Sequence, residues 1–96
     1  MARNDQPLSE QEVQDALAEL SGWSLDDGKL HKSFKFKDFG AALGWMVRVG
    51  LEAEKLDHHP DWCNAYNRVD VHLLTHSAGA LTELDVKLAK KMDSLV

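Results

Sequence analysis

Apolar residues recur along the chain at two spacings, and segments with one spacing alternate with segments with the other. In three segments, at residues 10–21, from 39 to a boundary set by Pro60, and from 82 onward, apolar side chains are three and four positions apart. This is the spacing of one helix face. Between these segments, apolar and polar residues alternate one by one, as in strands with one buried face. The pattern predicts the order helix, hairpin, helix, hairpin, helix.

Short local signals place the ends of these elements. Ser9–Glu12 has the spacing of a capping box, and Thr82–Asp85 opens the last helix in the same way, so helix capping accounts for Asp85. Asp27-Gly28 supplies the positive-φ residues of a tight hairpin turn. We expect the turn of the second hairpin near Asn67-Arg68, and Pro60 ends the second helix because a proline disfavours helical backbone in the residue before it.

The element order predicts an α+β fold. Two hairpins give a four-stranded antiparallel sheet, and three helices packed on one face of it would bury the apolar sides of both layers. The predicted order is α-β-β-α-β-β-α. Residues 9–96 form a single domain in this prediction, and residues 1–8, which are polar apart from a few positions, form a loose N-terminal arm.

Composition narrows the function classes. The 96 residues carry a formal net charge of −5, which argues against direct nucleic-acid binding. We expect the single cysteine, Cys63, to be a small packing residue in a reducing compartment. The chain has no apolar run of signal-peptide or membrane-spanning length, so we expect a cytoplasmic protein without membrane association. A chain of this size has a thin core, which favours a homo-oligomer.

Candidate acid–base residues gather in the second half of the chain. His58, His59 and His76 lie at the ends of regular elements, where side chains can converge on a cleft. Imidazole gives and takes protons near neutral pH because its ordinary pKa is about 6.5. Glu54 is four residues before His58, so its carboxylate would orient that ring if the helix continues. A solvated helix terminus remains an alternative explanation of the adjacent histidines.

The remaining histidines and aromatic residues have simpler explanations. His31 and His72 alternate with apolar neighbours, and we expect both to face solvent on the strands. Trp62 and Tyr66 are expected to pack on the sheet rather than stack on a substrate.

Two other chemistries fit the sequence less well. Three histidines and a carboxylate could bind zinc, but adjacent residues such as His58 and His59 diverge, whereas metal-binding helices space their ligands one turn apart. The chain lacks the Gly-x-Ser-x-Gly elbow of a serine hydrolase and a phosphate-binding glycine loop. Acid–base chemistry by histidine is the better hypothesis.

The spacing of these polar residues resembles the signature of the pterin-4a-carbinolamine dehydratases. The likeness covers nearly the whole chain, and its densest part runs Glu54-x3-His58-His59-Pro60-x5-Tyr66-x9-His76-x8-Asp85.

The resemblance implies loss of water from a 4a-hydroxytetrahydropterin, giving the quinonoid dihydropterin and so recycling the pterin of aromatic amino-acid hydroxylases such as phenylalanine hydroxylase. It implies a homodimer or homotetramer with no metal and no cofactor. By match to the motif, His58 and His76 would be the acid and base, and Glu54 would support His58. The substrate would be bound by Asp57, His59, Thr75 and Ser77. Some family members also serve as dimerisation cofactors of transcription factors, which leaves a binding module as the alternative function.

Overall fold

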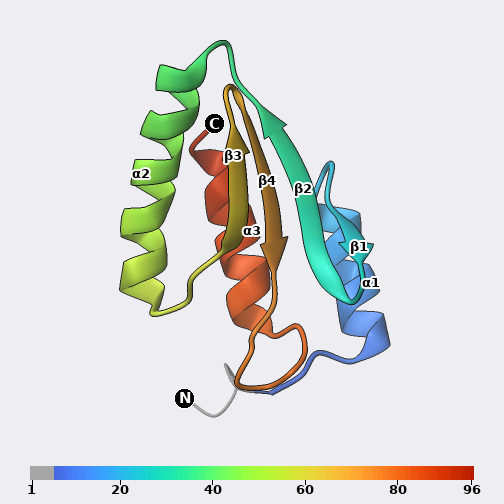
Figure 1. The fold of residues 1–96 in the computed structure, drawn as a ribbon. Coiled ribbons are helices and arrows are strands. Elements are labelled where there is room, and N and C mark those ends of the chain that lie inside the picture. Colours follow the sequence, from blue (N-terminus) through green and yellow to red (C-terminus); the bar gives the residue numbers. More distant parts are fainter. Residues whose placement is uncertain (1–5) are drawn as a thin grey trace.

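The computed structural model describes residues 6–96, and over this range it confirms the predicted α+β fold and element order. Helices cover one face of a single twisted sheet (Figure 1). The elements are α1 (Glu10–Glu19), β1 (Ser24–Asp26), β2 (Lys29–Lys35), α2 (Phe39–Leu56), β3 (Asp61–Ala65), β4 (Arg68–Leu73) and α3 (Glu83–Ser94).

The sheet has the strand order β1-β2-β4-β3, and every neighbouring pair is antiparallel. The two hairpins therefore lie side by side, with β2 and β4 in the centre. Their register places Leu30 opposite Leu73 and His31 opposite His72. Because side chains alternate between the faces of a strand, the leucine pair faces the helices and the histidine pair faces away from them.

The core lies between the helices and the sheet, and Trp45 of α2 is at its centre. Its side chain is completely buried, and its ring centroid lies 4.5 Å from that of Phe34 on β2. The indole Nε1–H donates a 3.1 Å hydrogen bond to the carbonyl of Met92 on α3. Trp45 thus joins all three parts of the fold: α2, α3 and the sheet.

The helix ends agree with the sequence except at the end of α2. Ser9 and Thr82 each form the predicted capping box. Helix α2 ends at Leu56, three residues before the one preceding Pro60, because Asp57 adopts the left-handed conformation with φ 52° and ψ 42°. The proline is therefore not what ends this helix.

Two predictions about single residues are wrong, and the turn of the second hairpin is slightly displaced. Cys63 is exposed on the edge strand β3, and Tyr66 is 66% exposed in the turn between β3 and β4, so neither packs in the core. The turn is one residue earlier than expected, since β4 already begins at Arg68. Trp62 does pack as predicted, with its ring centroid 5.9 Å from that of Trp45.

The domain also begins earlier in the sequence than predicted. Leu8, which the sequence analysis placed in the loose arm, donates its backbone N–H to the carbonyl of Leu81 at 2.8 Å and packs against the core. Residues 1–5 of that arm lie outside the described residues. None of the helices within residues 6–96 has both the length and the apolar character needed to cross a bilayer.

Candidate active site

Two connections carry the predicted site residues, and both lie at the same end of the sheet. The α2–β3 connection holds Asp57, His58 and His59, and the β4–α3 connection, which follows Leu73, holds Thr75 and His76. Figure 1 shows the lower end of α2, the end of β4 and the following loop at this edge of the molecule. The β3–β4 hairpin separates these two connections in the sequence, and the fold brings them to the same end of the sheet.

His58 is held by a buried carboxylate from α3. Its Nε2 lies 2.6 Å from Oδ1 of Asp85, and the two side chains are 9% and 0% exposed. A fully buried carboxylate is stable only when donors satisfy it. Asp85 accepts two further hydrogen bonds at Oδ2, from the Thr75 hydroxyl at 2.8 Å and the Thr82 backbone N–H at 2.9 Å.

The hydroxyl groups of Thr75 and Thr82 extend this network, and the donor of each hydrogen bond can be assigned. The Thr75 hydroxyl donates to Asp85, so at its 2.7 Å contact with Thr82 it acts as the acceptor. The Thr82 hydroxyl therefore donates to Thr75, while its oxygen also accepts from the backbone N–H of Leu84. No buried side-chain nitrogen or oxygen among residues 6–96 lacks a partner. The network fixes the loop before His76 to the start of α3.

The network also assigns the ring nitrogens of His58. An ionised carboxylate can only accept, so Nε2 carries the proton that is donated to Asp85. In the neutral ring this leaves Nδ1 as the nitrogen with a free lone pair. A carboxylate on the far side also stabilises the ring once Nδ1 has taken a proton. His58 can therefore act as a base at Nδ1 and return the proton as an acid.

The predicted pairing of Glu54 with His58 is wrong. Glu54 Oε1 lies 2.8 Å from Nε2 of His59, and both of these side chains are exposed. The reason is the left-handed Asp57, which ends α2 before His58 and so removes His58 from the helix face that Glu54 occupies. The two adjacent histidines have separate carboxylate partners, one buried and one at the surface.

His76 and Ser77 are exposed in a tight loop that follows the buried Thr75. Thr75 and Ala80 form an isolated antiparallel bridge that closes this loop. The turn also contains hydrogen bonds from Ala78 N–H to Thr75 O and from Gly79 N–H to His76 O, both 3.1 Å. Because Thr75 is bonded to Asp85, the base of the His76 loop is fixed to the network that holds His58.

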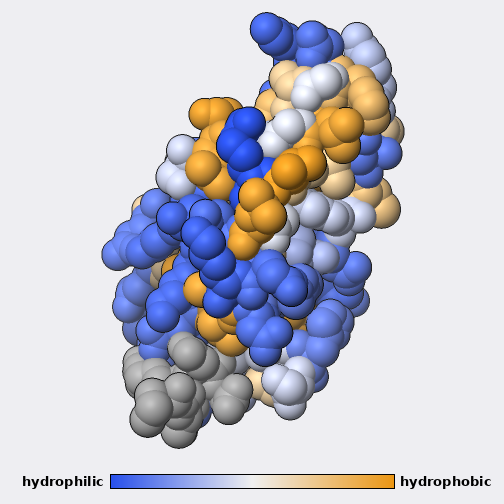
Figure 2. All heavy atoms as spheres, turned by 90° about the vertical axis from the view of Figure 1, so that its left-hand side faces the viewer, coloured by the Kyte–Doolittle hydropathy of each residue, from blue (hydrophilic) through white to orange (hydrophobic). Residues whose placement is uncertain are grey.

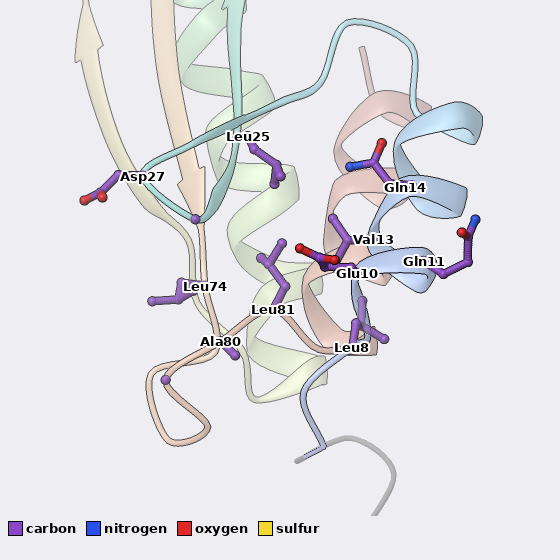
Figure 3. A pocket seen from close by; sticks show the side chains of 12 residues that line it. Leu8, Glu10, Gln11, Val13, Gln14, Leu25, Asp27, Leu74, Ala80 and Leu81 are labelled. Atoms are coloured by element: carbon purple, nitrogen blue, oxygen red, sulfur yellow. The ribbon is translucent and has the colours of Figure 1, made fainter.

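An open hollow of about 680 Å³ lies next to this loop but does not contain the predicted residues. Its apolar lining comes from Leu8, Val13, Leu25, Leu74 and Leu81, shown around the opening in Figure 3. Neither His58, His59 nor His76 lines it. The titratable residues that do line it, Glu10 and Asp27, are not among the predicted site residues.

Asp85 contacts a predicted site residue directly, although the sequence predicts only a capping role for it. Its position three residues after Thr82 is fully explained by helix capping, and it does cap α3. The second role, holding His58, depends on a contact across 27 residues. The spacing of the family signature, which ends at this aspartate, was the signal that could have found it.

Comparison with known proteins identifies the family of this chain. The family model described as "Pterin 4 alpha carbinolamine dehydratase" matches residues 6–95. A relative from Brucella ovis, named "Putative pterin-4-alpha-carbinolamine dehydratase", is 56% identical over 97 residues, covering 99% of this chain and 98% of its own. A protein from Brucella melitensis biotype 1 with the same name has the same identity and coverage.

A solved structure gives the same result for the fold. The crystal structure of "transcriptional coactivator/pterin dehydratase" from Brucella melitensis superimposes with a TM-score of 0.91 at 54% identity. The match covers 94% of this chain and 98% of the other. With a family match over almost the whole length, the chain belongs to the pterin-4a-carbinolamine dehydratase family.

Proposed function

We propose that this protein dehydrates 4a-hydroxytetrahydropterin to quinonoid dihydropterin and water, recycling the pterin used by aromatic amino-acid hydroxylases, phenylalanine hydroxylase among them. The family and the names of its relatives support the activity. In this proposal the reaction takes place in the cytoplasm, and the protein's own side chains carry out the chemistry.

The reaction breaks the C4a–O bond and removes the proton from N5. The bond electrons leave with the hydroxyl oxygen, an acid protonates that oxygen to release water, and the electrons of the N5–H bond form the C4a=N5 double bond. The atoms balance with one proton given and one taken. General acid–base catalysis of this kind is worth about 10²- to 10⁴-fold.

In the proposed mechanism, His58 and His76 share these two roles. The single observation that carries it is the buried His58–Asp85 pair, because it fixes one imidazole in a defined protonation pattern. His59, supported by Glu54, together with Asp57, Thr75 and Ser77, would position the pterin ring. Apart from Glu54, which lies on α2, these residues are on the two connections at one end of the sheet.

The direct test is a stopped-flow assay with freshly made 4a-hydroxytetrahydropterin, following dihydropterin formation with and without protein. Because the substrate also loses water unaided, the protein-free rate in the same buffer is the reference. We expect a saturable acceleration that is proportional to protein concentration. A rate equal to the reference at all protein concentrations would refute the proposed function.

A second candidate function, assembly with another protein, is favoured by the surface of α2. Four apolar side chains spaced four residues apart are about half exposed along this helix: Phe39, Leu43, Val47 and Leu51. Figure 2 views the molecule from the α2 side and shows apolar residues gathered over its upper part. The structural relative is named a transcriptional coactivator as well as a dehydratase.

We propose a second copy of this chain as the partner at the α2 stripe, defined as those four residues. A continuous apolar helix face is costly to expose, and a two-fold interface buries the same face on both copies. Gly40 and Gly44 lie on the same helix and reduce the bulk near the stripe, which permits close approach of a second helix. This supports the predicted homodimer or homotetramer.

A further inference from the structure

The face of the sheet turned away from the helices carries a stacked pair of histidines that the proposed dehydration does not use. His31 of β2 and His72 of β4 are directly opposite in register, and their ring centroids are 4.4 Å apart with 26° between the planes. Each ring contacts a carboxylate. Asp26 Oδ2 lies 2.9 Å from Nε2 of His72, and Asp70 Oδ1 lies 3.2 Å from Nε2 of His31.

Three of these side chains have the spacing of a metal site. One ligand atom each from Asp26, His31 and His72 lies within 4.8 Å of the other two. Two ligands bound to one zinc ion at about 2.0–2.2 Å are at most about 4 Å apart, so small side-chain rotations would bring them onto a shared ion. Within residues 6–96 this is the one such group of His, Cys, Asp and Glu.

The chemistry of the donors selects the kind of ion. Two imidazole nitrogens and one carboxylate oxygen are the ligands preferred by zinc and its neighbours among the divalent transition metals, whereas calcium and magnesium prefer oxygen alone. Both histidines are partly buried on the two central strands, so their backbones are held by hydrogen bonding on both sides. Rigid elements hold ligands better than loops do.

The charge of the surroundings favours a cation. A hollow of about 280 Å³ adjoins His72, and four aspartates line it against one lysine: Asp26, Asp27, Asp61, Asp70 and Lys29. The negative charge of these carboxylates repels anions and concentrates cations beside the stacked imidazoles.

We propose that Asp26, His31 and His72 bind one divalent transition-metal ion of the zinc class on the open face of the sheet. The three ligands come from three strands, β1, β2 and β4. The ion would fasten the three-residue strand β1, which pairs only with β2 within residues 6–96, to the central strands. Three protein ligands leave the fourth tetrahedral position for water.

Isothermal titration calorimetry with Zn²⁺ on the full chain, after treatment with a chelator, tests this site. We expect one ion per chain, and a loss of affinity of at least about tenfold in each of His31→Gln, His72→Gln and Asp26→Asn, because each removes a ligand. His59→Gln is the matched control, since His59 is likewise a histidine paired with a carboxylate, and it should keep the wild-type affinity.

Two outcomes would overturn the site: no binding of Zn²⁺ by the wild-type chain, or binding that survives His31→Gln and His72→Gln but is lost in His59→Gln. The second would place the ion at the α2–β3 connection instead. Circular dichroism of each variant separates ligand loss from unfolding, and Asp26→Asn, on an exposed edge strand, carries the test if a histidine variant unfolds. The readout is independent of dehydratase activity, so it stands whether or not the proposed reaction does.

Discussion

Asp85 Oδ1 lies 2.6 Å from Nε2 of His58, and this short contact joins the start of α3 to the end of α2. The carboxylate has no exposure to solvent and three donors around it. It therefore serves two purposes, capping α3 and fixing which nitrogen of His58 carries a proton.

Asp85→Asn should separate these purposes. The amide oxygen can still accept from Thr75 and Thr82, but its NH₂ group would face His58 and favour the opposite tautomer, with the proton on Nδ1. We expect kcat to fall by about 10²-fold or more, with an altered pH profile, while the fold remains. The measurement is kcat against pH.

The control for Asp85→Asn is Asp93→Asn, the same substitution on the same helix. Asp93 accepts hydrogen bonds from the Trp23 indole and from Lys32, and neither of these residues belongs to the site. We expect its variant to lose stability and keep its activity. Equal activity losses in the two variants would show that Asp85 has only a structural role.

Replacing the two proposed acid–base residues should remove most of the catalysis. His58→Ala and His76→Ala are each expected to lower kcat/KM by about 10²-fold, and the double variant to approach the uncatalysed rate. Because His58→Ala leaves Asp85 without its imidazole partner, His58→Gln is the better probe, since its amide can still donate to Asp85. His72→Ala, on the open face, should be close to wild type, and wild-type activity in both single alanine variants would refute the mechanism.

Trp45 should dominate the stability of the fold. Trp45→Ala removes a completely buried side chain, and we expect it to lower the free energy of unfolding by about 3–5 kcal/mol. Trp45→Phe keeps most of the volume but leaves the Met92 carbonyl without its indole donor, so a smaller loss of about 1–3 kcal/mol is expected. Chemical denaturation measures both. Equal losses would mean that packing volume contributes little.

Asp70 should make stability depend on pH at the acidic end. Hydrogen bonds from the Ser33 hydroxyl and then from His31 hold the pKa of Asp70 below its ordinary value of 3.8. A lowered pKa in the folded state favours folding above the unfolded pKa, and this contribution is lost as pH falls through the folded pKa. Since the side chain is 40% exposed, solvent screening keeps the effect small.

Comparing the free energies of unfolding of wild type and Asp70→Asn tests this pH dependence. Wild type should be the more stable protein near neutral pH, and the difference between the two free energies of unfolding should shrink below about pH 4. A difference that grows in acid would contradict the assignment.

The α2 stripe can be tested by adding charge. Val47→Glu puts a carboxylate in the middle of the stripe, and we expect the mass measured by light scattering to fall to that of one chain. Ala18→Glu adds the same charge at an exposed position of α1, away from the stripe, and should leave the mass of the wild-type assembly unchanged. A wild-type protein that is already monomeric would refute the homo-oligomer.

The element order could be predicted from the sequence because periodicity and capping are local. The helical spacing of α2 and the capping boxes at Ser9 and Thr82 depend on residues within a few positions of each other. Strand alternation placed His31 and His72 on the face away from the core, which the register confirms. Burial therefore follows from the pattern on the central strands β2 and β4, but not on α2, where the α2 stripe is about half exposed.

Pairings between elements could not be predicted in this way. The four-residue spacing predicts that Glu54 pairs with His58 if α2 continues. The left-handed Asp57 ends the helix, and Glu54 pairs with His59 instead. Asp85 and His58 are 27 residues apart, and His31 and His72 meet only because β2 and β4 are adjacent in the sheet. Side-chain partners at the site depend on tertiary contacts, which local spacing does not contain.

The backbone of Asp57 decides what its two neighbours can do. With φ at 52°, it sends one imidazole inward, where 9% of the side chain is exposed, and the next outward, where 59% is exposed. Aspartate, asparagine and glycine tolerate this geometry, whereas a branched side chain does not. We therefore expect a valine at this position to change the local backbone, so that one imidazole would no longer be buried beside Asp85 while the next stays at the surface.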